Sequence, residues 1–418
     1  MNLRNDVDFI VEESIKNVLP DEAVARALSG KEFGKGKIYV VAIGKAAWQM
    51  AKTASEVLGS RISLGVVCTK YEHAQGVIPS MICYEGGHPI PDKNSFRATQ
   101  AVLDMVADLK KEDTVLFLVS GGGSALFEKP LISEDELSWI TKEMMDKGAD
   151  ITEMNTIRKR LSAVKGGKFA RLCYPAHVFS IVLSDIIGDP LDMIASGPAY
   201  PDNSTRDDAF RIVEKYQLKL SERAIELLEE ELPKELEHVE TVITGSVREL
   251  CNAAGEACEK LGYQTMILTD QMNGQAREVG SFLSSIARTY QNSTESVAFI
   301  AGGETIVHVR GSGKGGRNQE LALGAAVGIA GIDNVAIFSI GSDGTDGPTD
   351  AAGGYVDGNT KEILEEKSID IFEVLEENDA YHALEKAAGL IITGPTGTNV
   401  NDVAVVLIKR NVSIIEKT

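Results

Sequence analysis

Short apolar runs alternate with amphipathic stretches along almost the whole chain. The runs are rich in Val and Ile and stay apolar on successive residues, which predicts strands that are buried on both faces. The predicted strands are Ile38–Ile43, Leu64–Cys68, Thr114–Val119, Val178–Leu183, Val239–Thr244, Gln264–Leu268, Ser296–Ala301, Thr305–Val309, Val335–Ile340 and Val403–Lys409. Because strands that alternate with helices pair in parallel, the pattern predicts an α/β fold with mainly parallel sheets flanked by helices.

The predicted helices lie between these runs, where apolar residues recur every three to four positions. They are Lys45–Leu58, Ser95–Leu109, Asp207–Tyr216, Val247–Leu261, Ala276–Thr289 and Asn318–Ile329. The acidic segment Ser221–His238, which contains Pro233, predicts a surface helix that leads into a connection. Since a chain of 418 residues is long enough for two cores, we predict one domain over residues 1–236 and a second over residues 237–418.

Composition narrows the class of protein. Hydrophobic residues make up 43% of the chain and charged residues 25%, as in ordinary globular proteins. The net charge of −20 argues against nucleic acid or an anionic membrane as a partner, but not against a small anion bound by a few Lys and Arg. Five cysteines without CxxC spacing indicate reduced thiols. With no signal peptide and no long apolar run, the sequence predicts a soluble cytoplasmic enzyme.

Glycine-rich segments follow several predicted strands, where open α/β sheets bind their ligands. The first is Ser120–Ser124, in which Gly121, Gly122 and Gly123 come in succession. Three glycines let the backbone approach a ligand closely and direct several N–H groups toward one anion. This pattern favours an anion site, although a flexible turn between a strand and a helix has a similar sequence.

The second glycine-rich segment, Gly311–Gly316, precedes a predicted helix that opens with Arg317 and Asn318. It fits the GxGxxG pattern, which on its own is weak evidence for a dinucleotide. A guanidinium beside the free N–H groups of a helix N-terminus, after Gly315 and Gly316, suits a phosphate or a carboxylate. The alternative is an arginine that is only solvated.

The third segment, Gly341–Gly354, carries three carboxylates, Asp343, Asp346 and Asp350. Carboxylates clustered in such a loop can hold Mg²⁺ beside a nucleotide or orient a hydroxyl group. Aspartates also serve as caps and turn residues, so each of the three keeps both interpretations. A fourth segment, Thr393–Asp402, is dense in hydroxyl groups and backbone donors.

Basic residues accompany the glycines at two further places. Lys45 stands just past a predicted buried strand, at the start of a helix, where its ammonium group can reach a phosphate over the strand end. Arg158, Ser162 and Lys165 have the spacing i, i+4 and i+7, which places them on one face of a predicted helix. That face could clamp a carboxylate, and an exposed basic face fits the same spacing.

Eight segments resemble the glycerate 2-kinases, also called the MOFRL or hydroxypyruvate-reductase-like family. In chain order they are GKAAWQMA, CYEGGHPIPD, SGGGSALFE, NTIRKRLSAVKGG, SDIIGDPLDMIASGP, GGRNQELAL, GSDGTDGPTDAAGG and TGPTGTNVND. The resemblance implies two Rossmann-like domains with the active site in the cleft between them. It also implies transfer of the γ-phosphoryl group of ATP to the 2-hydroxyl of D-glycerate with a divalent cation such as Mg²⁺. The catalytic lysine and arginine of the family match Lys45 and Arg317.

Phosphoryl transfer needs in-line placement and positive charge around the transferring group. The chain has no complete P-loop and no protein-kinase signature. From the catalytic pair that the resemblance implies, we predict that Lys45 and Arg317 supply the charge while Mg²⁺ bridges the nucleotide phosphates. The general base stays open: Asp189 and Asp192, which follow the strand Val178–Leu183, are candidates beside the aspartates of the third segment. Which loop binds glycerate and which binds ATP also stays open.

Two other functions compete with a kinase. The GSGKGG segment and Asp343 suggest a nicotinamide-dependent hydroxypyruvate reductase, but the sequence shows no obvious His–carboxylate pair for the proton that accompanies hydride transfer. A non-catalytic sugar-acid binding protein fits two domains around a cleft. It leaves the number of separate glycine-rich loops unexplained, because a sensor for a small acid needs only one pocket.

Overall fold

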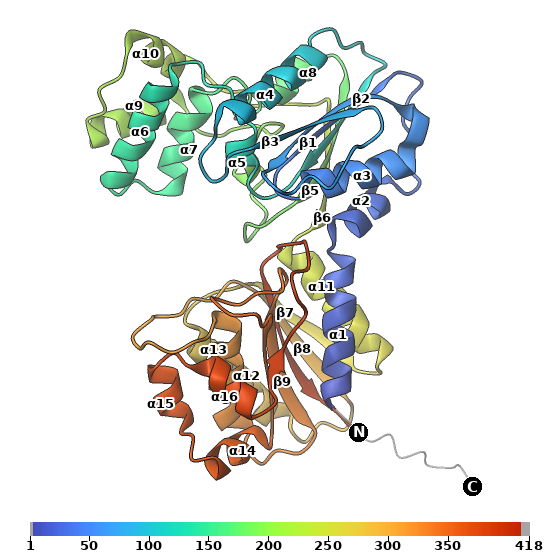
Figure 1. The fold of residues 1–418 in the computed structure, drawn as a ribbon, viewed down its shortest axis with the longest axis vertical. Coiled ribbons are helices and arrows are strands. Elements are labelled where there is room, and N and C mark those ends of the chain that lie inside the picture. The colour runs from blue at the N-terminus through green and yellow to red at the C-terminus, as the bar shows by residue number, and fades with distance from the viewer. Residues whose placement is uncertain (1–2, 411–418) are drawn as a thin grey trace. The chain divides into compact units, whose positions relative to one another are not determined.

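The computed structural model describes residues 3–410, which form two compact units. The N-terminal unit comprises residues 23–184 and 189–244, and the C-terminal unit comprises residues up to 22, residues 185–188 and the chain from 245 onward. This division differs from a single boundary near residue 237, since residues 185–188 also group with the C-terminal unit. Strand β6 (Val239–Gly245) joins the N-terminal sheet, and helix α1 (Leu3–Asn17) packs on α11 (Val247–Lys260) of the C-terminal unit (Figure 1). The strand over Val239–Thr244 was predicted, but a local pattern does not show which sheet a strand joins.

The N-terminal unit is built on one six-stranded sheet in the order β3-β2-β1-β4-β5-β6. Its other strands are β1 (Ile38–Ile43), β2 (Ile62–Lys70), β3 (Met81–Gly86), β4 (Thr114–Val119) and β5 (His177–Leu183). The pairings from β3 to β5 are all parallel. Every residue of β4 is buried, as expected of a central strand that is covered on both faces.

Helices of the N-terminal unit fall into two groups. Four of them contact the sheet: α3 (Ala47–Leu58), α4 (Lys93–Met105), α5 (Gly123–Leu126) and α8 (Lys168–Cys173). Four others pack on one another around a separate apolar core (Figure 1): α6 (Glu134–Asp146), α7 (Ile151–Arg160), α9 (Arg206–Tyr216) and α10 (Glu222–Glu229). Helix α2 (Pro20–Leu28) follows α1. The acidic helix predicted over Ser221–His238 ends at Glu229, four residues before Pro233.

The C-terminal unit has a second six-stranded sheet, in the order β11-β10-β9-β12-β8-β7. Its strands are β7 (Gln264–Met272), β8 (Val297–Gly303), β9 (Val335–Gly341), β10 (Gly353–Asp357), β11 (Leu390–Ile391) and β12 (Asp402–Ile408). Only β7 and β8 pair in parallel, whereas β12 runs antiparallel to both β8 and β9. The α/β class is thus confirmed, but this sheet is mixed, because β10 follows β9 without a helical crossover and β12 inserts between β8 and β9.

Helices cover both faces of this second sheet. On one face lie α12 (Ala276–Tyr290), α13 (Arg317–Ile329), α14 (Thr360–Glu366), α15 (Ile371–Glu376) and α16 (Ala380–Lys386). On the other face, α1 and α11 lie side by side (Figure 1). The strand predicted over Thr305–Val309 is wrong: this segment makes one isolated bridge, at Ile306. The two places beside β8 are already taken by β7 and β12.

Candidate active site

In the N-terminal unit, the carboxyl ends of β1 and β4 meet at one edge of the parallel sheet. Gly44 follows β1 with a φ of +112°, and a Cβ on it would lie 2.3 Å from the carbonyl oxygen of Ser120. The backbone N–H of Lys45 donates to the carbonyl of Gly121 at 2.9 Å, and the N–H of Ala46 donates to Ser120 Oγ at 3.1 Å. The turn that carries Lys45 is therefore fixed between two strand ends.

The side chain of Lys45 is exposed and runs past the glycine loop. A Cβ on Gly122 would lie 3.3 Å from Lys45 Cγ and 3.0 Å from His88 Cδ2. Gly122 itself has a φ of +85°, a left-handed conformation that favours glycine. The sequence thus brings Lys45 and the predicted anion loop together, at the edge where α/β sheets bind ligands.

The Ser120–Ser124 loop is held by side chains from other segments of the N-terminal unit. Ser124 Oγ lies 3.0 Å from Ser196 Oγ, and the Lys165 ammonium donates to the carbonyl of Ser124 at 2.6 Å and to that of Phe127 at 3.3 Å. These contacts fix both ends of α5. The loop is therefore a supported turn and not a loose connection.

The predicted basic helix face of Arg158, Ser162 and Lys165 is wrong. Helix α7 ends at Arg160, because the chain turns to form a bridge between Ser162 and Pro130. Lys165 lies beyond that turn with 0% of its side chain exposed, where burial lowers its pKa to about 8. It bonds the glycine loop from inside the unit instead of sharing a solvent-facing surface with Arg158.

Neighbouring cations are also buried and bonded within the unit. Lys159 pairs with the buried carboxylate of Asp202 at 2.5 Å and lies 3.4 Å from Asp192. Lys168 donates to the carbonyls of Arg160 and Ser162 at 2.8 and 2.7 Å. Lys159, Lys165 and Lys168 of this segment therefore hold the chain around α7 in place.

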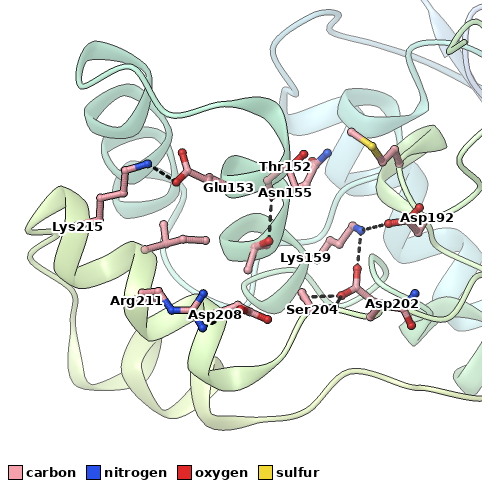
Figure 2. A pocket seen from close by; sticks show the side chains of 14 residues that line it. Thr152, Glu153, Asn155, Lys159, Asp192, Asp202, Ser204, Asp208, Arg211 and Lys215 are labelled. Carbon is pink, nitrogen blue, oxygen red and sulfur yellow. Dashed lines mark hydrogen bonds and ion pairs between the residues drawn. The ribbon is translucent and has the colours of Figure 1, made fainter.

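A cavity of about 420 Å³ lies among α7, α9 and the segment 202–204. Figure 2 shows Lys159 reaching from α7 toward both Asp192 and Asp202 at this cavity. Asp192 is thus placed at a cavity wall, whereas Asp189 adopts a φ of +51° and has an Oδ1 atom that is buried without a hydrogen-bond partner in the described chain. The two aspartates predicted as alternative bases therefore have different surroundings.

In the C-terminal unit, the mixed sheet brings an aspartate to the edge where two neighbouring strands end. Asp402 is the first residue of β12 and is in register with Gly303 and Gly341, the last residues of β8 and β9. The guanidinium of Arg317, at the start of α13, makes two bonds to it, Nε to Oδ2 at 2.5 Å and Nη2 to Oδ1 at 2.9 Å. Arg317 Nη1 lies 3.1 Å from Glu304 Oε1. The hydrogen-bonded Asp402 raises the pKa of Arg317, which stays charged.

Asp346 forms the N-terminal cap of α13, although it comes from the loop between β9 and β10. Its carboxylate accepts bonds from the backbone N–H groups of Asn318 at 3.1 Å and Gln319 at 2.9 Å. A Cβ on Gly316 would lie 2.3 Å from the Asp346 carboxyl carbon, so the close approach requires a glycine. Burial raises the pKa of Asp346 to about 6. Asn318, predicted to bind phosphate, is buried and accepts a bond from Ser339.

The other two aspartates of this loop differ from Asp346 and from each other. A Cβ on Gly341 would lie 3.3 Å from Asp343 Oδ1 and 3.4 Å from Asp402 Oδ1, so Asp343 lies near the carboxylate that pairs with Arg317. Asp350 is exposed, and its bond from the Tyr381 hydroxyl at 2.7 Å lowers its pKa. Over residues 3–410, no three His, Cys, Asp or Glu side chains are grouped so that they could hold a metal ion.

Sequence reasoning missed the two carboxylates that partner Arg317. One feature of the sequence could have pointed to Asp402: it is a charged residue directly before the apolar run of β12, at the end of the segment Thr393–Asp402. Its position opposite Arg317 depends on the antiparallel insertion of β12, which periodicity does not reveal. Glu304 had no such signal.

Comparison with known proteins places the chain in a family. A family model described as a domain of unknown function matches residues 6–229, and the MOFRL family model matches residues 297–402. The chain is 49% identical to the D-glycerate 2-kinase of Thermotoga maritima, over 96% of this chain and 97% of that protein. It is 40% identical to the glycerate 2-kinase of Pyrococcus horikoshii, over 98% of both.

The fold agrees with these matches. A crystal structure of glycerate kinase from Thermotoga maritima superposes with a TM-score of 0.92 at 48% identity, covering 97% of this chain and 99% of that one. The fold is α/β, and these full-length matches place the chain among the kinases. The chain belongs to the MOFRL family of glycerate 2-kinases. None of its described helices combines the length and the apolar character needed to cross a membrane.

Proposed function

We propose that this chain is an ATP-dependent glycerate 2-kinase, which converts D-glycerate and ATP to 2-phospho-D-glycerate and ADP. The observation that carries this proposal is the likeness, over nearly the full length of both chains, to a protein named D-glycerate 2-kinase. The cations at the strand ends of both units support it. A kinase acts on a nucleotide and a second small substrate, and both are anions here, so they suit cationic sites.

In direct in-line transfer, the protein positions the two reactants and neutralises the negative charge on the transferring phosphoryl group. It contributes little covalent chemistry of its own. Lys45 supplies an exposed ammonium group on a fixed turn, and Arg317 supplies a guanidinium group at the start of α13. The N–H groups of the Ser120–Ser124 loop donate hydrogen bonds to an anionic group of one substrate. These are the roles that we assign to the chain's own residues.

We also propose that Mg²⁺ takes part. This ion is usually held by one or two carboxylates together with nucleotide phosphates and water, so the protein need not supply a complete cage. Asp343, the carboxylate next to the Arg317–Asp402 pair, suits that role in its donor chemistry. When bound, the ion neutralises charge on the phosphate oxygens.

We assign no general base to the reaction. A loose transition state needs little help in removing the proton of the attacking hydroxyl group. Asp346 is occupied by the N-terminal N–H groups of α13, and Asp350 by the hydroxyl of Tyr381. Asp189, Asp192 and Asp343 stay as candidates.

We propose that the enzyme works in the cytoplasm. All five of its cysteines are free thiols, as is usual in a reducing compartment. Burial raises the pKa of Cys68 and Cys251 to about 12, so these thiols stay protonated and unreactive.

One assay tests the function. The purified protein is incubated with D-glycerate, ATP and Mg²⁺ and coupled to enolase without phosphoglycerate mutase. Phosphoenolpyruvate is expected, because enolase acts directly on the 2-phosphate. Oxidation of NADH with hydroxypyruvate, in the absence of phosphoenolpyruvate, would support a reductase. Tight binding of glycerate without either product would support a binding protein.

A further inference from the structure

Arg317 has two carboxylate partners that hold it in different ways. Asp402 is 1% exposed and contacts two nitrogens of the guanidinium group, at 2.5 and 2.9 Å. Glu304 is 47% exposed and contacts only Nη1, at 3.1 Å. Two parallel bonds fix the plane of a guanidinium group. A single contact to an exposed carboxylate is weak and is readily exchanged for another anion.

The carboxylate of Asp402 is itself fixed by the sheet. Asp402 pairs with Gly303 of β8 on one side and with Gly341 of β9 on the other, so its backbone is held by two neighbouring strands. A Cβ on Gly341 would lie 3.4 Å from Asp402 Oδ1, which shows how closely the carboxylate lies against β9. The direction of the Arg317 guanidinium is therefore set by the centre of the sheet, not by a surface loop.

From this geometry, and resting on the proposed function, we propose that Asp402 is the positioning residue of Arg317. It holds the Nε and Nη2 edge of the guanidinium group, so that the Nη1 end, where Glu304 now lies, is the end that meets the transferring phosphoryl group. Glu304 yields this place to the phosphoryl oxygens when the nucleotide binds. Asp402 does not touch the substrates and acts only through the orientation of Arg317.

The first test is Asp402→Asn, which keeps the size of the side chain and removes its charge. We expect kcat for glycerate phosphorylation to fall about 10- to 100-fold, as is typical when a supporting residue loses its hold on a reactive group. The KM values for glycerate and ATP should change little, because the charge of Arg317 remains. A structural role alone would lower the amount of folded protein without this selective loss of kcat.

Glu320→Gln is the matched control. Glu320 is a buried carboxylate on the same helix, and it bonds Arg277 Nε at 3.1 Å and the Asn378 side chain at 3.2 Å. This variant also weakens a buried Arg–carboxylate pair of the C-terminal unit, so it should lower the unfolding temperature as well. Its kcat should stay within about twofold of wild type, because the Glu320 side chain bonds Arg277 and Asn378 and not Arg317.

Arg317→Lys keeps the test decisive if Asp402→Asn does not fold. Lysine retains the charge but cannot make two parallel bonds to a carboxylate, so kcat should fall at least 10-fold, as expected for a lost directed contact. In the double variant the two losses should be less than additive, because both remove one interaction. Wild-type kcat in folded Asp402→Asn or in Arg317→Lys overturns the proposal. Failure of the proposed function is a separate result, since wild type itself would then make no 2-phosphoglycerate.

Discussion

Basic residues lie next to glycine-rich sequence at three places in this chain, and the fold uses them in two different ways. In the segment 158–168, Lys165 and Lys168 are buried and donate to backbone carbonyls. Lys45 and Arg317 instead each follow a glycine, Lys45 just before α3 and Arg317 as the first residue of α13, and both side chains are exposed or partly exposed. A cation near glycines in sequence is therefore not evidence of a ligand site. Its position relative to the ligand-binding edge of a sheet is the better guide.

The comparison between buried and exposed cations can be tested by mutation. We expect the largest effect on stability from Lys165→Met. The change removes the ammonium group and leaves the carboxylate of Glu128, which is 1% exposed and lies 3.5 Å from it, buried without its charge partner. We expect the free energy of unfolding, measured with denaturant, to fall by about 3–5 kcal/mol. The double variant Lys165→Met/Glu128→Gln should recover part of the loss. A single variant as stable as wild type would mean that this cation does not hold the fold.

The largest effect on activity is expected from Lys45→Ala. Its charge faces the transferring group in our account, so kcat should fall about 10²-fold or more, by analogy with other cations aimed at a transition state. The unfolding temperature should hardly change, because the side chain is exposed. Lys52→Ala, which removes an exposed lysine from α3, is the control and should keep wild-type kcat. Full activity in folded Lys45→Ala would remove Lys45 from the site.

Arg317→Ala should lose as much activity as Lys45→Ala, but with a cost in stability. The reason is that Asp402 would stay buried without its guanidinium partner. The two cations at the strand ends therefore differ in a measurable way. If Arg317→Ala were as stable as wild type, the ion pair with Asp402 would be less important than its geometry suggests.

A smaller effect is expected from Asp346→Ala. The variant removes the acceptor for two backbone N–H groups at the start of α13. The free energy of unfolding should fall by about 1–2 kcal/mol, as for other helix caps. Asp350→Ala, in the same loop, is the control, because Asp350 is exposed and its removal should leave the free energy of unfolding nearly unchanged. Equal losses in both variants would contradict the distinction between these aspartates.

The pH dependence of stability gives the smallest effect. Burial lowers the pKa of Lys165 to about 8, below the value near 10.4 of a lysine in an unfolded chain. Between these values the unfolded chain binds more protons, so the contribution of this group to stability rises with pH. The difference in free energy of unfolding between wild type and Lys165→Met should increase from pH 8 to pH 9, by at most about 1.4 kcal/mol. A flat or falling difference would contradict the buried position of the ammonium group.

The elements at the centre of the first sheet could be predicted from sequence. The predicted bounds of β1 and β4 are those of the structure, because a strand buried on both faces is apolar at every position. Strand β10 could not be predicted, since it starts with two glycines and depends on pairing with β9 and β11. The helix predicted through Lys165 failed because a spacing of 3.6 residues does not reveal that the chain turns after Arg160.

The parts of the candidate site that depend on local sequence could be predicted, and the parts that depend on tertiary contacts could not. Lys45 and Arg317 stand at junctions that glycine marks in the sequence, so their places at helix starts followed from local signals. The partners Asp402 and Glu304 come to Arg317 through strand order, which depends on contacts between segments far apart in the chain. Local patterns therefore predict which cations are presented, whereas tertiary structure decides what orients them.

The position of the phosphoryl group in the product is the most direct test of the proposed function. The measurement is a proton-coupled ³¹P spectrum of the product formed by wild-type protein from D-glycerate and ATP. A phosphate on the 2-position is next to a carbon with a single hydrogen, so we predict a doublet for the new phosphomonoester. A triplet, which a phosphate on the CH₂ carbon gives, or the absence of any new phosphomonoester would contradict a glycerate 2-kinase.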